Sequence, residues 1–343
     1  MKNLMFFLLV LIFVVACKNK DSQFVIADLS HSISTPKVAE ILYSFDDAYP
    51  VSVAVKDSLI YIIKIKTDTC MSVLNKNTRK ILCNFGLVGL GPNDVIRPDF
   101  ISTVDSSYVL IEDVSVKKFM TIEYNTDTAC ILKKYIDYPS KIFPSGETNI
   151  SKNFIVGRQI GKGKMLYIYN RLIDSMIEID YYPIIKGIKH DRNYVFAPTL
   201  VLNENKNRII VGMYLFDMFH VFDLYGKRLK TVTFSNYELP KFDSKDLMAD
   251  IQKSSAGIIR SFATKNYCYL LRIVGDRITN NLQNMIVKLD WDGNLIEVYE
   301  IKDKIEGQFY VDEQNKKMYV IRHRIVQEST VSEIFELISY QLN

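Results

Sequence analysis

The sequence predicts an all-β protein that folds as a six-bladed β-propeller, with four-stranded antiparallel blades around a central axis. Short β-branched and aromatic runs alternate with turn-forming residues about every 8 to 12 residues, which is typical of all-β folds. Units of this kind also recur at a nearly constant spacing. The composition agrees, because 21 Tyr and 19 Phe residues against 14 Gly and 9 Pro favour strands.

The charge balance excludes one class of partner. The 43 Lys and Arg residues exceed the 39 Asp and Glu residues by so little that the formal net charge is only +4, and no long basic run occurs. We therefore expect no nucleic-acid partner. With 48% hydrophobic and 24% charged residues, the chain also has enough apolar material for a large core, which excludes a disordered protein.

The first 17 residues, MKNLMFFLLVLIFVVAC, predict a lipoprotein signal peptide. Lys2 precedes an uncharged apolar run over 4–16, which is shorter than the roughly 20 residues that a membrane-spanning helix needs. The run ends at Ala16-Cys17, which resembles a bacterial lipobox, so we expect Cys17 to carry the lipid that anchors the mature chain in the membrane. An ordinary secretory peptide with a chance cysteine is the alternative. Because Lys18 is not the Asp of an inner-membrane retention signal, the expected location is the cell envelope, at the outer membrane.

Residues 18–37 are mostly polar and predict a tether between the membrane and the folded domain, which we expect over 38–343. A short apolar patch interrupts the tether, so 24–29 could instead dock on the domain as a strand.

The repeating unit consists of an apolar strand that follows a polar turn, with further strands and a tight turn downstream. The clearest strands are 59–66, 108–112, 165–169, 208–212, 267–273 and 317–322. The clearest downstream turns are 221–227 (VFDLYGK) and 287–294 (VKLDWDGN), where a strand passes through Asp into a Gly turn.

Six such units fit the chain. They start near Tyr49, Pro98, Glu147, Phe196, Gly257 and Ile305, at intervals of 49, 49, 49, 61 and 48 residues. This period is typical of propeller blades, whereas the rival β-sandwich needs no recurring period. A short helix over 239–251, capped by Asp243 or Ser244, accounts for the long interval. For closure, we expect 40–45 to pair with the last unit, in which 335–341 is the third or fourth strand.

A glycine-rich segment, 86–98 (GLVGLGPNDVIRP), lies between the first two units. No Lys-Ser/Thr pair and no helix follow it, so it is not a phosphate-binding loop. We expect an inter-blade loop in which the glycines supply unusual φ angles and Asp94 caps a turn.

Together, the lipobox, this loop and the regular spacing of the blades resemble those of the six-bladed β-propeller lipoproteins of Bacteroides-type bacteria. The resemblance extends to TolB-like and NHL-like propellers. The family's G-x-G-P-x-E/D loop corresponds here to Gly89, Gly91, Pro92 and Asp94. The resemblance implies a fold and a location, and it implies no particular activity.

The cysteines leave one pairing open. Cys70 and Cys83 lie at equal distances from the turn over 75–78, so they oppose each other if the loop consists of Lys76 and Asn77. They then form either a disulfide or two buried free thiols. We expect Cys130 and Cys268 to be core residues.

No catalytic or metal-binding motif stands out, so we expect no catalytic residue, no metal and no cofactor. The four histidines show neither HxH nor HExxH spacing, and no Gly-x-Ser-x-Gly elbow occurs.

A ligand site is expected where the inner strands converge at the axis. Five basic residues fall near inner strands or the loops that feed them: Arg97, Arg158, His190, Arg192 and Arg260. Converging, they would form a cationic ring suited to carboxylate, sulfate or acidic-glycan ligands. Scattered surface arginines are the alternative.

The predicted function is therefore that of a lipid-anchored binding or scaffold module of the cell envelope, which recognises a protein, peptide or glycan at the propeller mouth. The alternative is a propeller-type enzyme, lyase-like or lactonase-like, with an axial metal. Such an enzyme would place Asp, Asn, Glu or His side chains around the axis, and the candidate inner strands 258–262 and 309–312 show no regular supply of them.

Overall fold

The computed structural model describes residues 23–30, 32–46, 48–91, 93–104, 107–125, 129–142, 146–158, 164–182, 195–234, 245–279, 281–327 and 331–342. The signal peptide with Cys17, and also Pro92, His190 and Arg192, lie outside the described residues.

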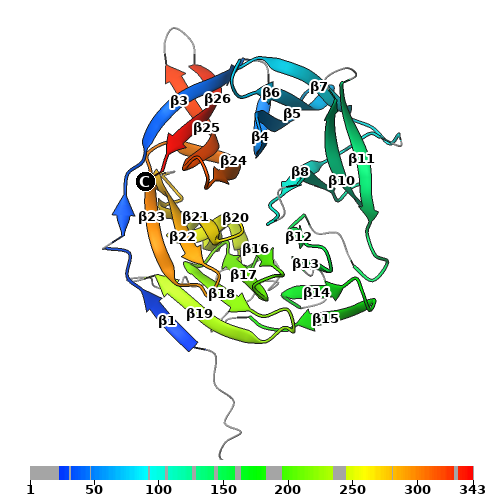
Figure 1. The fold of residues 1–343 in the computed structure, drawn as a ribbon. Coiled ribbons are helices and arrows are strands. Elements are labelled where there is room, and N and C mark those ends of the chain that lie inside the picture. Colours follow the sequence, from blue (N-terminus) through cyan, green and yellow to red (C-terminus); the bar gives the residue numbers. More distant parts are fainter. Residues whose placement is uncertain are drawn as a thin grey trace, which may run out of the picture.

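The described strands form six four-stranded antiparallel blades around a common axis, as predicted (Figure 1). Blade 1 contains β4 (Tyr49–Lys56), β5 (Leu59–Ile65), β6 (Thr69–Asn75) and β7 (Ile81–Leu87); blade 2 contains β8 (Pro98–Ile101), β9 (Val109–Asp113), β10 (Lys118–Asn125) and β11 (Ala129–Asp137); blade 3 contains β12 (Thr148–Ile150), β13 (Phe154–Arg158), β14 (Leu166–Asn170) and β15 (Ser175–Ile179). Blade 4 contains β16 (Pro198–Asn203), β17 (Arg208–Met213), β18 (Met218–Phe222) and β19 (Arg228–Phe234); blade 5 contains β20 (Ala256–Ala263), β21 (Tyr267–Asp276), β22 (Asn281–Asp290) and β23 (Leu295–Ile301); blade 6 contains β24 (Lys304–Asp312), β25 (Lys317–Gln327), β26 (Val331–Gln341) and β3 (Lys37–Phe45).

The first strand of each blade in the list above, from β4 to β24, lies innermost (Figure 1). The blades start where the period places them: β4 and β8 begin at the expected residues, and the other four inner strands begin within two residues of them.

Blade 6 closes the ring with an early strand. β3 pairs antiparallel with β26, with Phe45 opposite Phe335 and Tyr43 opposite Leu337, which confirms the expected closure. On the inner side, a parallel bridge between Gln308 of β24 and Ser52 of β4 joins blades 6 and 1. The ring is therefore closed at both its outer and its inner circumference.

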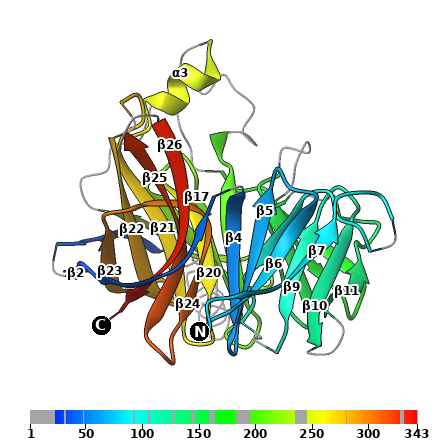
Figure 2. The same cartoon turned by 90° about the horizontal axis from the view of Figure 1, so that it is seen from above.

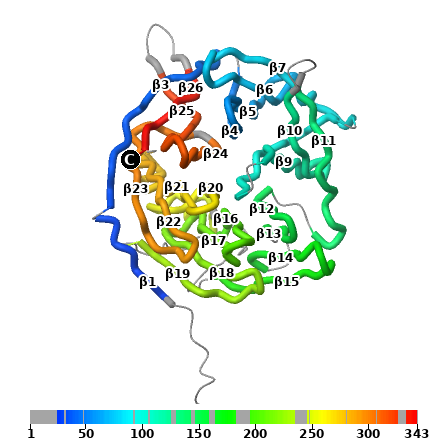
Figure 3. Tube along the Cα trace, viewed as in Figure 1, coloured from blue at the N-terminus to red at the C-terminus, as the bar shows by residue number. Residues whose placement is uncertain are grey.

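The N-terminal segment runs around the outside of the ring, where β1 (Gln23–Ala27) and β2 (Ile33–Ser34) lie beside the outer strands of blades 4 and 5 (Figure 3). β1 pairs in parallel with β19, and β2 pairs in parallel with β23. The described part of 18–37 is therefore not a free tether, and the alternative of a docked strand holds for it. Docking covers two exposed sheet edges.

Asp-to-Gly turns end the third strands of blades 4 and 5, as the sequence predicts. Asp223 Oδ1 accepts hydrogen bonds from the backbone N–H groups of Tyr225 and Lys227, and Gly226 adopts a φ of 82°. The turn after Asp290 repeats this arrangement, with Gly293 at 73°. A positive φ of this kind favours glycine because it has no Cβ.

The insertion before blade 5 contains the helix α3 (Leu247–Gln252), which projects from one end of the ring (Figure 2). Asp246 caps it by accepting a hydrogen bond from the backbone N–H of Met248, so the cap is neither Asp243 nor Ser244. No helix among the described residues is long and apolar enough to cross a membrane.

The described core consists of six hydrophobic clusters, one at each seam between neighbouring blades. At the seam between blades 4 and 5, for example, Phe219 and Val221 pack with Leu270 and Val287. A seam core of this kind explains why strands such as β9 are buried along their whole length, because both faces of a blade are covered. Each fully buried aliphatic or aromatic side chain contributes about 1.5–3 kcal/mol to the free energy of unfolding.

Candidate functional site

A cavity of about 320 Å³ opens at the end of the axis where the inner strands finish; we call it the mouth cavity. The ends of β4, β8, β20 and β24 line it, together with the loops that follow these strands. Its aromatic lining comes from Phe100, Tyr108, Phe262 and Tyr310. The cavity therefore joins blades 1, 2, 5 and 6.

Hydrogen bonds fix the polar side of the mouth cavity. The carboxylate of Glu313 accepts hydrogen bonds from the Thr264 hydroxyl, from Asn266 Nδ2 at 3.2 Å and from the Tyr269 hydroxyl at 3.2 Å. On the inner side, Gln308 Nε2 donates to the carbonyl of Ser261 at 2.8 Å. These contacts hold the lining residues in place without any ligand.

Charges of both signs surround the mouth cavity. Lys56 and Lys265 contribute positive charge, whereas Asp57, Asp312 and Glu313 contribute negative charge. The cavity therefore carries no strong excess of either sign.

A second group of charged residues lies nearer to the other end of the axis, where the inner strands begin. Asp99 of β8 and Glu147, which immediately precedes β12, face Arg260 of β20 across the axis. Arg260 Nη1 lies 3.8 Å from Glu147 Oε1. We call Asp99, Glu112 and Glu147 the axial carboxyl cluster.

Glu112 joins this cluster through strand pairing. It lies directly opposite Asp99 in the antiparallel pair of β8 and β9, so both side chains emerge on the same face. The same face carries Ile101 and Leu110, which pack against blade 3. Glu112 is only 3% exposed, so its carboxyl lies in the seam between blades 2 and 3.

Burial changes the acidity of these carboxyls. Desolvation raises the pKa of Glu112 to about 8, against a smaller lowering by the Thr148 hydroxyl, and Glu147 and Asp99 raise it further. Desolvation also raises the pKa of Glu147 to about 7, although Arg260 opposes the shift. The pKa of Asp99 is likewise raised by desolvation, with Arg260 as the main opposing charge. Glu112 is therefore neutral at pH 7.

The structure places the predicted ligand-binding residues in a mixed cluster. Arg158 and Arg260 act on Glu147, while Arg97 and Arg260 act on Asp99. The three described arginines thus come together around carboxyls, so they do not form the purely cationic ring that we expected. His190 and Arg192 lie outside the described residues.

Sequence reasoning missed all three carboxyls. Two signals were present: Glu112 ends a run that is otherwise apolar, and Asp99 interrupts the short strand PDFI. A charged residue on a strand buried on both faces is unusual, and it marks a position that packing alone does not explain.

The family loop is an inter-blade connector, in which Asp94 plays the expected capping role. Asp94 Oδ2 accepts a hydrogen bond from the backbone N–H of Gly91 at 2.8 Å. A Cβ at Gly89 or Gly91 would lie 2.4 or 2.7 Å from the same oxygen. Both glycines are therefore required by the close approach of this carboxylate. The positive φ that we expected in this segment is found at Gly86, at 73°, and not at Gly89 or Gly91.

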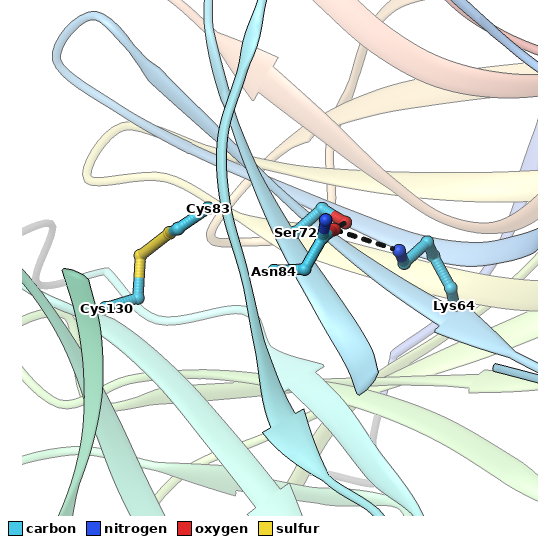
Figure 4. The surroundings of a disulfide bond; sticks show 5 residues. All are labelled: Lys64, Ser72, Cys83, Asn84 and Cys130. Carbon is cyan, nitrogen blue, oxygen red and sulfur yellow. Dashed lines mark hydrogen bonds between the residues drawn. A yellow bond between two sulfur atoms is a disulfide. The ribbon is translucent and has the colours of Figure 1, made fainter. Parts of the chain in front are cut away.

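The disulfide joins Cys83 of β7 to Cys130 of β11, so the proposed Cys70–Cys83 pairing is wrong (Figure 4). The β6–β7 loop is longer than two residues, because Asn75 pairs with Lys80, and a register shift follows at Val73 and Leu74.

This register places Cys83 opposite Val73. Cys70 is a buried free thiol that donates to the carbonyl of Gly86, and burial raises its pKa to about 11. Cys268 is buried, as expected, whereas Cys130 is buried within the disulfide. On the opposite face of β7, Asn84 Oδ1 accepts hydrogen bonds from Ser72 and Lys64 (Figure 4).

Among the described residues, no group of three or more His, Cys, Asp or Glu side chains is arranged to hold a metal ion.

Comparison with known proteins identifies the fold. A family model described as TolB-like, 6-blade propeller-like, matches residues 30–314. Among solved structures, a member of the duf4221 family from Bacteroides vulgatus superposes with a TM-score of 0.56 at 15% identity, covering 90% of this chain and 100% of that one. A Bacteroides fragilis protein described as exported gives 0.52 at 10% identity, covering 94% and 99%. A search of curated proteins finds no significant match.

Proposed function

We propose that this chain, which belongs to the TolB-like six-blade propeller-like family, is a lipid-anchored binding protein of the cell envelope that takes the end of a neutral glycan in the mouth cavity. The observation that carries the proposal is the cavity itself, because it is concave, lined by fixed polar groups and walled by aromatic rings.

The lining favours a polyhydroxyl ligand. Tyr108 and Tyr310 are partly exposed, so they offer ring surface to the apolar faces of a sugar. The lining also contains the Ser102 hydroxyl and the Asn315 amide, which are groups that both donate and accept hydrogen bonds. A volume of about 320 Å³ suits one or two sugar rings and is at the small end of ligand pockets.

The charges of the mouth cavity favour a neutral ligand. Lys265 and Asp57 are exposed on the rim, and their opposite charges give no net attraction to a strongly acidic or basic molecule. A peptide is the main competing ligand, since its amide groups use the same hydrogen-bonding groups.

The proposed location of the protein in the cell envelope is based on its N-terminal segment. The lipobox at Cys17 supports an anchor in the cell envelope, and similarity to a Bacteroides fragilis protein described as exported supports export. A disulfide is consistent with an oxidising compartment outside the cytoplasm.

Two matched substitutions test the binding site. Gln314 and Asn205 are exposed residues in the equivalent hairpins of blades 6 and 4, but only Gln314 lines the mouth cavity. We expect Gln314→Trp to cover the cavity and weaken binding of a neutral oligosaccharide at least tenfold, while Asn205→Trp leaves it unchanged.

The measurement is calorimetry with the mature chain against panels of neutral oligosaccharides, acidic oligosaccharides and peptides. Binding of peptides in place of neutral oligosaccharides, or equal binding by the two tryptophan variants, would overturn the proposal.

Metabolic labelling with a fatty acid tests the anchor. We expect the wild-type chain to carry the label and to fractionate with the outer membrane, and Cys17→Ala to lose both properties. Protease treatment of intact cells then reports which side the propeller faces.

A further inference from the structure

Arg260 and Arg97 act on Asp99, but Glu112, on the directly opposite residue, has no such counter-charge among the described residues. The two carboxyls lie on directly opposite residues of β8 and β9, an arrangement that destabilises a sheet when both are ionised. Neither forms an ion pair with a described residue. Glu112 Oε1 is also buried without a hydrogen-bond partner among the described residues.

Several polar atoms around this pair also lack a hydrogen-bond partner among the described residues. Three neighbouring side chains are buried and have a polar atom without a hydrogen-bond partner among the described residues: Ser52 Oγ, Thr148 Oγ1 and Tyr167 Oη. Ser52 lies beside Asp99, and Thr148 lies beside Glu112 and Tyr167. All three are hydroxyls, so each can accept a hydrogen bond from a donor group.

The carboxyl groups in this region outnumber the guanidinium groups. The described carboxyls are Asp99, Glu112, Asp113 and Glu147, and the described guanidinium groups are Arg97, Arg158 and Arg260. Asp113 is already satisfied by the backbone N–H groups of Ile96 and Arg97 on one oxygen and of Ser115 on the other. Arg260 lies nearest to Glu147. Arg97, Arg158 and Arg260 act on Asp99 and Glu147, so Glu112 is the carboxyl on which no described guanidinium group acts.

We propose that the axial carboxyl cluster is a second binding site, distinct from the mouth cavity, which takes the ammonium group of an amine ligand in exchange for one proton. The exchange conserves charge, because the Glu112 carboxyl releases its proton to solvent and the resulting carboxylate pairs with the ammonium group. Asp99 provides the second carboxylate, and one of the Ser52, Thr148 and Tyr167 hydroxyls accepts the third N–H bond of the ammonium group.

The axis gives an amine access to this site. The side chain of Glu147 is 32% exposed and Asp99 is also exposed, although both come from the inner circumference of the ring. The exposed surface of both side chains therefore belongs to the inner circumference of the ring. An ammonium group that enters from this end meets Asp99 and Glu147 first and reaches Glu112 behind them.

The proton exchange makes binding depend on pH. The raised pKa of Glu112, about 8, means that the amine must displace a proton at pH 7 and need not do so at pH 9. Affinity therefore rises as the pH increases through 7 and 8, and it levels off above the pKa of Glu112.

Calorimetry on the mature wild-type chain tests the exchange without any variant. The probe is n-butylamine, with 1-butanol and butyrate as the neutral and anionic comparators, each titrated in two buffers of different protonation enthalpy. We expect only the amine to bind, with about one proton released at pH 7 and far less at pH 9. Tighter binding of butyrate, no binding of the amine, or proton release that K⁺ alone produces would each overturn the proposal.

Two isosteric substitutions locate the site. Glu112→Gln imitates the neutral carboxyl, so we expect it to abolish proton release and to weaken amine binding at least tenfold. Glu123→Gln is the matched control, because Glu123 lies on β10 of the same blade with its side chain 55% exposed. Equal amine binding by Glu112→Gln and wild type would contradict the proposal. Gln314→Trp should leave amine binding unchanged, so the two proposed sites fail or succeed separately.

Discussion

Cys83 and Cys130 form a disulfide between the outer strands of blades 1 and 2, at a sequence separation of 47 residues. β7 and β11 belong to different sheets, so no backbone ladder joins them. The disulfide therefore fastens a seam that otherwise depends on side-chain packing.

Removing this disulfide should destabilise the propeller. In the chain-entropy model, a cross-link at a sequence separation of 47 residues raises the free energy of the unfolded chain by about 4 kcal/mol. We expect Cys83→Ser/Cys130→Ser to lower the free energy of unfolding by up to that amount in denaturant titrations. Cys70→Ser is the control for loss of a buried thiol alone. A double variant as stable as the wild type would show that the seam does not need the bridge.

The buried pair of Arg272 and Asp217 offers a second test. Both nitrogens of the guanidinium fork lie 2.6 Å from the Asp217 carboxylate, and the side chains are 8% and 1% exposed. Arg272→Met leaves a buried carboxylate unpaired, so it should cost about 3 to 5 kcal/mol. Adding Asp217→Leu should restore most of the loss in a double-mutant cycle. Additive losses would contradict the pairing.

Gly157 makes room for a buried tyrosine beside the axial carboxyl cluster. A Cβ at this position would lie 2.3 Å from the Tyr167 hydroxyl oxygen, and Tyr167 is fully buried. We expect Gly157→Ala to cost about 1 to 3 kcal/mol in denaturant unfolding through overpacking. Combining it with Tyr167→Leu should remove this additional cost. If Gly157→Ala unfolds at the wild-type midpoint, the close approach is wrong.

Charged substitutions should release the strand β1 from the ring on one of its two faces only. Val25 packs against the core of blades 4 and 5, whereas Ile26 is 66% exposed on the opposite face. We expect Val25→Asp to release β1 and to speed amide exchange in β19. Ile26→Asp should leave exchange at the wild-type rate. Equal effects of the two substitutions would mean that β1 does not dock in this register.

Stability should fall as the pH rises, because Glu112 binds a proton more tightly in the folded state. The unfolded chain releases this proton near pH 4.5, whereas the folded protein holds it until about pH 8. The stabilisation of the folded state by this bound proton is complete below pH 4.5 and is lost progressively up to pH 8. Glu112→Gln cannot titrate, so we expect it to be more stable than the wild type at pH 8.5 by on the order of 3 kcal/mol. A wild-type stability that rises between pH 5 and 8 in parallel with that of the variant would contradict this.

The blade boundaries could be predicted because they depend on local patterns. Strand alternation and turn residues repeat with the blade, so Tyr49 and Pro98 mark true strand starts. The closure by β3 could be predicted because a propeller needs a partner for its last outer edge.

The pairings between blades could not be predicted in the same way. Cys83 meets Cys130 only because blades 1 and 2 pack side by side, and the four-residue loop at the β6–β7 turn moves Cys83 away from Cys70. Likewise, Asp99 and Glu112 become neighbours through the β8–β9 register, and Arg260 reaches them from the far side of the axis. Such contacts depend on tertiary packing, on which the local pattern carries no information.

The protonation state of Glu112 tests the central claim about the axial carboxyl cluster most directly. Infrared difference spectra between the wild type and Glu112→Gln isolate the C=O stretch of the protonated carboxyl as a function of pH. We predict that this band is present at pH 7 and disappears with a midpoint near pH 8. A Glu112 carboxyl that is already ionised at pH 6 would contradict the account.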